Sequence, residues 1–512
     1  MRSVLCLLLL VAIPITGFSA TIKVPGDYST IQEAILAAVN GDTVSVAPGF
    51  YQENINFLGK AITVKSSFGA VLTIISATEA DSVVRFDSGE GLDSVLEGFT
   101  VTNGRSQTGG AGILCDNSSS PTIRKNIITA NLAEGLLSSG GGISCTINSS
   151  PLITENTIFL NVAVLAGGGI ACSLSSNPVI SRNSIWGNAV TFSGGGISCS
   201  AASPEITNNF IYTNITAGEA GGGAGIYLLG STAVLTNNAL LGNTCLGVGS
   251  KGGGIQCDTL SSVTVRNTIL WGNQADLGKE IQLGGFLFQP TLSIAFSDVE
   301  GGKSSVLVDS GATLNWESGM IDAYPDVKSM GPVLYDLHLN PLSPCINTGT
   351  NVDAPALDFD GDARPEMGTV DIGADEFNGS HPLDCDTFTI SETTGGTLQL
   401  GIHGGKENAG RHYMIFGTIS GTAPGTALPG GMKILPINWD AFTEVVANMN
   451  YPDSILFDKF YGTLDGNGNS QAVFNTNGPV PDTLGVVVSF AYPLMGPPWD
   501  FASNPVNVEI VP

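Results

Sequence analysis

The chain has 512 residues, with 19 Lys or Arg against 45 Asp or Glu, so its formal net charge is −26. Such an excess of negative charge repels phosphate backbones and argues against nucleic acid as a partner. Only 12% of the residues are charged while 67 are glycine, a composition typical of stacked β-coils with tight turns, so the expected class is all-β.

The first twenty residues have the pattern of an export signal. Arg2 precedes an apolar run from Val4 to Ile15, and the small residues Ser19 and Ala20 follow. We therefore interpret residues 1–20 as a signal peptide that is cleaved after Ala20. No later apolar stretch approaches the roughly 20 residues that a membrane span needs. The expected product is a secreted or cell-surface protein with no transmembrane segment after signal removal.

A short α-helix is predicted over residues 29–41. Its first four residues, Ser-Thr-Ile-Gln, fit a capping box, Ile31 and Ile35 lie one helical turn apart, and Asn40-Gly41 can end the helix. Such a helix would cover the open first coil of a stack of strands, an edge that otherwise invites aggregation.

A period of 27 to 30 residues dominates the next part of the chain. The first half of each repeat reads Gly112-Ile-Leu-Cys115, Gly142-Ile-Ser-Cys145, Gly169-Ile-Ala-Cys172, Gly196-Ile-Ser-Cys199, Gly225-Ile-Tyr-Leu228 and Gly254-Ile-Gln-Cys257. The second half places an Asn two residues before an aliphatic residue, at Asn126, Asn156, Asn183, Asn209, Asn238 and Asn267. Both patterns recur in step, which predicts one structural coil for each repeat.

Each half of the repeat has the alternation of a strand. Ile143 and Cys145 share one face while Ser144 takes the other, so two strands per coil are expected. Stacking identical coils at about 4.8 Å puts like residues above like, which predicts columns of Ile, Cys and Asn, with a hydrogen-bonded Asn ladder at the turns. Residues 42–101 read as earlier, less regular coils.

With these repeats the chain resembles the pectin-lyase-like superfamily of right-handed parallel β-helices, over residues 21–299. The helix at residues 29–41 matches the usual N-terminal cap of that superfamily. The glycine runs that alternate with Ile-Phe-Leu-Asn161 and Ile-Trp-Gly-Asn188 are also similar to the repeats of polymorphic outer-membrane proteins, a family of surface adhesins. The resemblance implies a β-helix solenoid, either carrying a polysaccharide-degrading site or serving as an adhesin.

Two further parts follow the repeats. Residues 300–378 are similar to the closing module of bacterial surface β-helix proteins, as Leu337 to Gly349 and Val370 to Phe377 illustrate. Residues 386–512 alternate strand-like runs with Gly/Pro turns, which predicts a separate β-rich domain, with a sandwich as the suggested form.

The repeats do not carry an evident catalytic cluster. Between Arg105 and Ala275 there are six basic residues, six acidic residues and no His. Lys125, Glu155 and Arg182 each directly precede the repeat Asn, and their alternating sign predicts a salt-bridge ladder. The catalytic residues of pectate lyases cannot be carried over to any position here, so we leave the enzyme question open while favouring a non-catalytic protein.

One outward column is aromatic, with Phe159, Trp186 and Tyr212 in consecutive coils and Trp271 close to register two coils on. Aromatic rings on a flat wall can form a platform for sugar rings, because the C–H face of a pyranose packs against them. The alternative is that a loop covers the column, or that the rings only strengthen strand pairing.

We favour buried thiols for the cysteines of the column, because stacked parallel Cβ vectors keep the spacing of the coils, and a strained disulfide between adjacent coils is the alternative. These cysteines are Cys115, Cys145, Cys172 and Cys199. The sequence leaves open whether Cys345 and Cys385 form a disulfide bond.

Three aspartates resemble the start of a calcium loop: Asp358, Asp360 and Asp362. The glycine and the glutamate of such a loop are missing, so we favour an Asx-rich turn in which Arg364 pairs with Asp371 or Glu376. Calcium remains the alternative.

The leading functional hypothesis is an exported, non-catalytic β-helix protein that binds polysaccharide or another cell-surface component. One rival is a lyase, epimerase or hydrolase acting on an acidic glycan, which rests on fold analogy. Another is a purely structural spacer of the cell envelope.

Overall fold

The computed structural model describes residues 19–285, 288–330, 335–341, 343–365, 368–377, 382–387, 389–422, 425–429, 433–449, 454–481 and 483–512. Most of the predicted signal peptide therefore lies outside the described residues. The chain divides into two compact units. The first comprises residues 1–325 and 345–376, and the second comprises residues 326–344 and 377–512. The predicted closing module, residues 300–378, falls partly in each unit.

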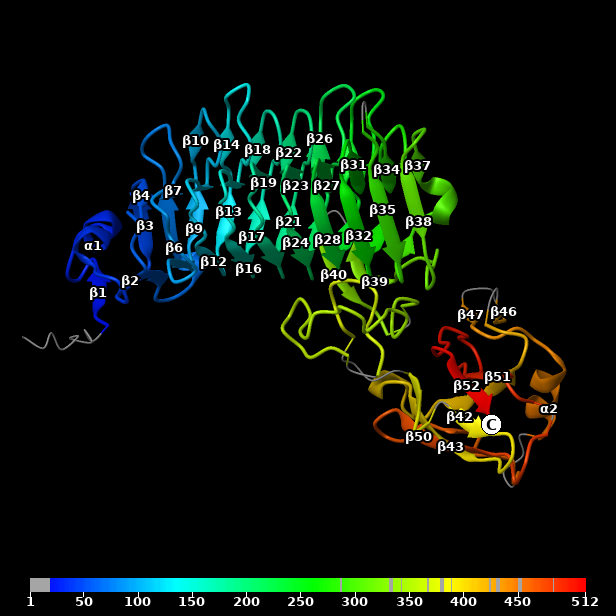
Figure 1. Ribbon diagram of the computed structural model, residues 1–512. Coiled ribbons are helices and arrows are strands. Elements are labelled where there is room, and N and C mark those ends of the chain that lie inside the picture. The colour runs from blue at the N-terminus through cyan, green and yellow to red at the C-terminus, as the bar shows by residue number, and fades with distance from the viewer. Residues whose placement is uncertain are drawn as a thin grey trace, which may run out of the picture. The chain divides into compact units, whose positions relative to one another are not determined.

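The first unit is a solenoid of parallel strands stacked from α1 to β38 (Figure 1). Sheet A contains β1 (Thr21–Val24), β2 (Thr43–Val46), β5 (Thr63–Ser66), β8 (Val95–Glu97), β12 (Thr122–Arg124), β16 (Leu152–Thr154), β20 (Val179–Ser181), β24 (Glu205–Thr207), β28 (Thr232–Thr236), β32 (Ser262–Arg266), β35 (Thr291–Ala295) and β38 (Thr313–Trp316). Sheet B contains β3 (Gly49–Gln52), β6 (Thr73–Ser76), β9 (Thr100–Thr102), β13 (Ile127–Thr129), β17 (Thr157–Phe159), β21 (Ser184–Trp186), β25 (Phe210–Tyr212), β29 (Ala239–Leu241), β33 (Ile269–Trp271) and β36 (Asp298–Val299).

Two further sheets contribute to the coils, and sheet D, with six strands, is shorter than the other three. Sheet C contains β4 (Ile55–Asn56), β7 (Val84–Phe86), β11 (Ile113–Cys115), β15 (Ile143–Cys145), β19 (Ile170–Ser173), β23 (Ile197–Ser200), β27 (Ile226–Leu229), β31 (Ile255–Asp258), β34 (Ile281–Leu283) and β37 (Leu307–Val308). Sheet D is formed by β10 (Arg105–Ser106), β14 (Leu132–Ala133), β18 (Val162–Ala163), β22 (Ala189–Val190), β26 (Ile215–Thr216) and β30 (Thr244–Cys245). The chain visits sheets C, A, B and D in turn, so the two strands predicted for each coil are sheets C and B, and the structure adds two more.

The register of the strands puts like residues above like, as the repeat predicted. Ile113 pairs with Ile143 and then with Ile170, and the cysteines of the same strands pair with one another. The inward-facing side chains of sheets A, B and C form one continuous core. The four cysteines of the column are free and buried, and burial raises the pKa of Cys257 further along the column well above its usual range.

The predicted helix is α1 (Ile31–Ala37), which ends four residues earlier than predicted. Its N-cap is Thr30, one residue later than the capping box placed it, and the Thr30 hydroxyl accepts a hydrogen bond from the Glu33 amide at 3.1 Å. Ile31 and Ile35 are fully buried and join the core of the first coils, so the helix covers that end of the stack.

Two Asn ladders run along the solenoid. The predicted ladder is formed by Asn126, Asn156, Asn183, Asn209 and Asn238, and from Asn156 onward each side-chain oxygen accepts from the backbone and side-chain nitrogens of the Asn one coil before. The prediction was wrong for Asn267, because the register shifts by one residue and Thr268 takes the ladder position. A second ladder, which we had not predicted, comprises Asn131, Asn161, Asn188, Asn214, Asn243 and Asn273. The signal in the sequence was the Asn that lies three residues after the inward-facing Ile or Leu of sheet B in each of these coils.

The glycine runs lie where the chain passes from sheet D into sheet C. A Cβ atom on Gly141 would lie 2.5 Å from the Val162 carbonyl oxygen and 2.6 Å from that of Gly168. Only glycine permits this approach between the backbones of adjacent coils. The close approach of adjacent coils at this corner therefore requires the glycine runs.

The second unit is built mainly from antiparallel strands. One four-stranded sheet contains β41 (Leu383–Cys385), β43 (Thr397–His403), β50 (Asn469–Asn475) and β48 (Phe457–Asp458), and the other contains β42 (Thr389–Ser391), β52 (Val506–Val511), β51 (Val487–Ala491) and β45 (Phe416–Thr418). The remaining elements are the pairs β39 (Val327–Met330) with β40 (Tyr335–Leu339), β44 (His412–Met414) with β49 (Tyr461–Thr463) and β46 (Thr426–Ala427) with β47 (Ile434–Leu435), and helix α2 (Ala441–Met449). One core takes side chains from both four-stranded sheets, among them Leu400 and Val508. The β-rich fold predicted for this region is confirmed.

The described residues also contain three short 3₁₀ turns: η1 (Ala70–Leu72), η2 (Gly302–Ser305) and η3 (Lys406–Asn408). Within the described residues, the structure contains no helix that combines the length and the apolar character needed to cross a bilayer.

Candidate functional site

The predicted aromatic column lies on the outer face of sheet B. Phe159 pairs in register with Trp186, and Trp186 pairs with Tyr212. The ring centroids of Phe159 and Trp186 lie 4.4 Å apart with planes 9° from parallel, and those of Trp186 and Tyr212 lie 6.0 Å apart at 14°. We call these three residues the aromatic stack.

The stacking decides which part of each ring can meet a ligand. The facing surfaces of neighbouring rings cover one another, so the stack presents ring edges to solvent and not the flat wall that the sequence suggested. Phe159 and Trp186 are half-buried, while Tyr212 is only 9% exposed. Trp271 lies in register with Tyr212 two coils further on, and Leu241 occupies the coil between them. The Trp271 ring packs edge-on against Tyr324, with ring centroids 6.1 Å apart.

Residues 345–376, which we call the strap, fold back onto the β-helix and pack on the later coils of this face. The Phe359 ring lies 4.2 Å from the Phe210 ring, and Gly373 packs on Ile269. In these coils the outward residues Phe210 and Ile269 are almost fully buried. In the two coils before them, the equivalent residues Thr157 and Ser184 remain half-exposed.

Three Asn side chains attach the strap. Asn208 donates to the Leu357 carbonyl at 2.6 Å, Asn237 donates to the Asp371 carbonyl at 2.9 Å, and Asn267 donates to the Thr350 carbonyl at 2.9 Å. All three occupy the left-handed turn position that precedes the ladder, where φ lies between 48° and 54°. The sequence analysis did not predict this role, and it assigned Asn267 to the ladder. The signal was present, because the turn position holds a charged residue in three coils, up to Arg182, and an Asn from the fourth coil on.

The same turn position in the earlier coils carries the predicted charge ladder. Glu155 forms ion pairs with Arg182 on one side and with Lys125, at 3.6 Å, on the other. Arg182 and Glu155 are mostly covered, with side chains 21% and 29% exposed. These two ion pairs confirm the salt-bridge ladder that the alternating charges predicted.

The strap holds its shape through a buried ion pair. The side chain of Arg364 is fully buried, lies 3.1 Å from the Glu376 carboxylate and donates to the Gly373 carbonyl at 3.0 Å. Asp358 is also buried, and one of its carboxylate oxygens accepts from the amides of Gly361 and Asp362. This is the Asx-rich turn that we favoured, with Arg364 paired to Glu376.

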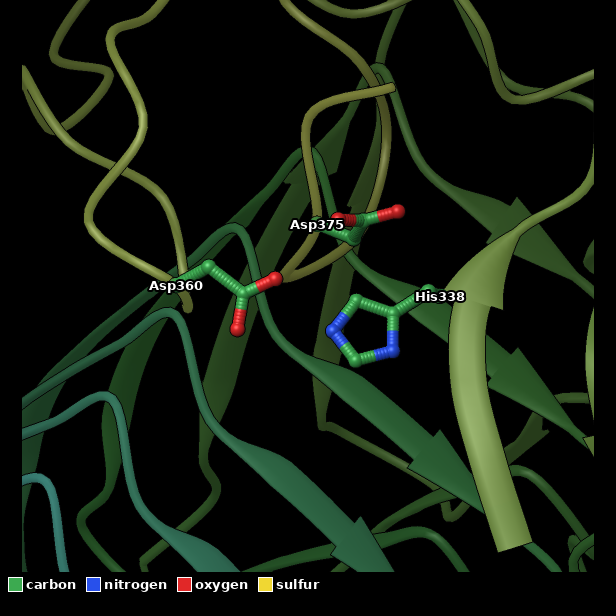
Figure 2. Close-up of side chains that lie close together, drawn as sticks. All are labelled: His338, Asp360 and Asp375. Atoms are coloured by element: carbon green, nitrogen blue, oxygen red, sulfur yellow. The ribbon is translucent and has the colours of Figure 1, made fainter. Parts of the chain in front are cut away.

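The three aspartates of the suggested calcium loop have different surroundings. Asp358 is engaged by backbone amides, whereas Asp360 has a second carboxylate, that of Asp375, as a neighbour in the strap (Figure 2). The ligand atoms of Asp360 and Asp375 lie within 4.8 Å of one another. His338, also drawn in Figure 2, belongs to β40 of the second unit, where its Nδ1 contacts Asp336. A calcium site at Asp358, Asp360 and Asp362 stays a prediction.

An open notch of about 190 Å³ lies where the strap meets the uncovered coils. It is lined by Glu155, Asn156, Thr157, Arg182, Ser184, Phe359 and Asp360. Thr157 and Ser184 belong to the same strands as Phe159 and Trp186 and share their outward orientation, so the notch and the aromatic stack are neighbours on one face. The Ser184 hydroxyl also lies 3.4 Å from the Tyr212 hydroxyl.

Three further titratable groups of the first unit, those of Glu280, Asp298 and Cys345, are buried. Burial raises the pKa of Glu280 to about 8 and that of Asp298 to about 7. Glu280 accepts from the backbone and side-chain nitrogens of Asn273, so it ends the second ladder. The Cys345 thiol donates to Asp298 at 3.5 Å, within the core. These groups hold the last coils together and line neither the notch nor the aromatic stack.

His403 and His412 of the second unit lie on different pairs of strands. His403 on β43 contacts the Asp384 carboxylate at 3.1 Å, which raises the His403 pKa. His412 on β44 contacts the Thr463 hydroxyl at 2.8 Å. The sequence suggested no triad from these two residues, and their described contacts are local to each pair of strands.

Comparison with known proteins places this architecture in a class. Residues 83–270 match the family described as the right-handed β-helix region. The first unit is accordingly a right-handed parallel β-helix, as the sequence predicted. No curated protein sequence matches the chain.

Several solved structures of polysaccharide lyases are similar to the chain. The pectate lyase Pel9A is 13% identical, with 71% of this chain and 97% of that chain covered and a TM-score of 0.41. The PL6 family alginate lyase AlyGC is 12% identical, with 74% and 62% covered and a TM-score of 0.29. A mannuronic acid specific family 6 lyase from human gut microbiota is 11% identical, with 61% and 89% covered and a TM-score of 0.25.

Proposed function

We propose that the chain is a polysaccharide-binding β-helix protein and that the outer face of sheet B is its binding surface. The observation that carries the proposal is the aromatic stack beside a polar notch. Carbohydrate sites combine apolar contact to sugar C–H groups with a few fixed polar groups that orient the hydroxyls. Phe159 and Trp186 supply the apolar contact. Arg182, Ser184 and Thr157 supply the polar groups.

The orientation of the rings favours a polymer over a small sugar. Ring edges at successive coils form a ridge that follows the axis of the solenoid, with one step for each coil. A chain laid along this ridge contacts Phe159 and Trp186 in turn. The structure pre-forms the ridge, so binding costs little ordering of the protein.

Binding requires no catalytic group, and we propose a protein that holds its polysaccharide without cleaving it. We also propose that it acts outside the cell, as a secreted or surface-attached protein. Two findings would support this location: a mature N-terminus at Thr21 and recovery of the native protein from the medium or the cell surface.

A glycan array tests the proposal, with the full chain, the variant Trp186→Ala and the control Trp271→Ala. Trp271 occupies the same outward row but is separated from the stack by Leu241. We expect Trp186→Ala to lose about tenfold in affinity, since an aromatic contact contributes roughly 1 kcal/mol or more, and Trp271→Ala to bind as the wild type does.

Each polysaccharide that binds is also incubated with the protein and assayed for unsaturated or reducing-end products. Product formation would overturn the non-catalytic part of the proposal in favour of a lyase or a hydrolase. Absence of binding to any polysaccharide would leave a structural spacer as the better account.

A further inference from the structure

The charged side chains that line the notch do not favour an acidic ligand. They are one cation, Arg182, and two carboxylates, Glu155 and Asp360. Arg182 forms an ion pair with Glu155, and Lys125, which does not line the notch, also pairs with Glu155. A lining with more carboxylates than cations does not attract an acidic ligand.

A ligand carboxylate would also have to compete for Arg182. Arg182 is covered on one side by the backbone of Gly361, since a Cβ atom there would lie 3.0 Å from the guanidinium, and on another side by Glu155. Binding a uronate at Arg182 means displacing Glu155, which is 29% exposed and would lose its closest partner. Uncompensated charges in partly buried positions are unfavourable.

Sugar hydroxyls face no such penalty. A hydroxyl group donates to Glu155 and accepts from Arg182 without breaking their ion pair, and the hydroxyls of Thr157 and Ser184 can do either. The ring of Phe359 gives one wall of the notch an apolar surface against which C–H groups pack.

From this geometry we infer that the notch between the strap and the coils of Glu155 and Arg182 is a subsite for one uncharged sugar residue of the bound polymer. Its volume of about 190 Å³ lies below the range for drug-sized ligands, which suits a single ring. The inference rests on the proposed function and adds the substrate class: the polysaccharide is neutral at this position, and the Glu155–Arg182 pair is the specificity element.

The test compares uncharged polymers (β-glucan, xylan and mannan) with acidic ones (polygalacturonate, alginate and hyaluronan). The proteins are the full chain, Glu155→Gln and Arg182→Gln. The control is Glu97→Gln, which breaks a similar ion pair, between Arg124 and Glu97 at 2.7 Å, away from the notch. Thermal unfolding confirms that each variant is folded, and affinity is measured at two ionic strengths.

We expect the wild type to bind an uncharged polymer and Glu155→Gln to bind it about tenfold more weakly, because a hydrogen bond to a charged group is lost. Glu155→Gln should also gain affinity for acidic polymers, because Arg182 is released. Glu97→Gln should change neither. Binding of the wild type to acidic polymers only, with loss in Arg182→Gln, would overturn the neutral subsite and leave the proposed function intact. Absence of binding to both classes would overturn both.

Discussion

The side chain of Asn183 links its own coil by hydrogen bonds to the coil before and to the coil after it. Its oxygen accepts from the backbone and side-chain nitrogens of Asn156 at 2.9 and 3.0 Å. Its nitrogen donates to the Ile153 carbonyl at 2.9 Å and to the Asn209 side-chain oxygen at 3.0 Å. Asn183 is fully buried, so water cannot replace the hydrogen bonds that this side chain makes.

We therefore expect Asn183→Ala to lower the free energy of unfolding by about 3 kcal/mol or more, because several buried polar groups lose their partner at once. Asn315→Ala is the matched control, since Asn315 is exposed and makes one hydrogen bond, to Ser293 at 3.0 Å. Urea unfolding of the β-helix measures both. Equal, small changes in the two variants would contradict a stabilising role for the ladder.

The outward aromatic residues show which structural features a sequence repeat predicts and which it does not. The repeat places Phe159, Trp186 and Tyr212 in one column, and the structure has them in register. The repeat does not say that the rings stack face to face. That arrangement depends on side-chain packing between coils, to which a pattern of residue types is insensitive.

At the scale of elements, the ends of the two ladders differ from their interior. The first ladder passes from Asn238 to the hydroxyl of Thr268, and the second ends at the carboxyl group of Glu280. Burial is the largest cause of the raised pKa of Glu280, and the nearby Glu300 raises it further. A carboxyl group that prefers to be protonated thus closes the second ladder.

This termination makes the stability of the β-helix depend on pH. The pKa of Glu280 is about 8 when folded and about 4.5 when unfolded, so between these values the unfolded chain releases a proton that the folded protein retains. Stability is full below about pH 4 and falls as the pH rises to about 8, by at most about 5 kcal/mol from this group. Asp298, with a pKa of about 7, acts in the same direction.

Glu280→Gln should flatten this dependence, so that the variant gains stability relative to the wild type at pH 8 and not at pH 4. Unfolding at a series of pH values, with the exposed Glu317→Gln as a control, measures the slopes. The same slope in Glu280→Gln and in the wild type would assign the pH dependence to other groups.

At the scale of the whole molecule, each compact unit has a core of its own. The β-helix core runs from Val24 to Val299, and the core of the second unit includes residues from Leu383 to Ile510. Separate cores unfold as separate cooperative units unless their stabilities coincide.

We expect denaturant unfolding to show at least two transitions. Trp186, Trp271 and Trp316 report on the first unit, and Trp439 and Trp499 report on the second. Tryptophan fluorescence and calorimetry together resolve the steps. A single transition that coincides for both probes would show that the two units unfold together.

The sequence by itself determined the architecture of the β-helix. The period, the strand alternation and the Asn and Cys columns are set by local patterns that repeat along the coils. The capping helix and the charge ladder at Glu155 are each set by a short local pattern of their own. A solenoid contacts only its neighbouring coils, so the same short-range rule applies throughout and a repeat is sufficient to predict it.

Only the tertiary structure decided where the strap docks, and with it the notch. The Asn208 and Asn237 hydrogen bonds to the strap join residues 149 and 134 positions apart in the chain. Such contacts depend on matching shapes and on buried polar groups finding partners, and no periodicity encodes them. The site therefore combines the outer face of sheet B, which the repeat predicts, with the strap, a segment distant in sequence that packs on this face.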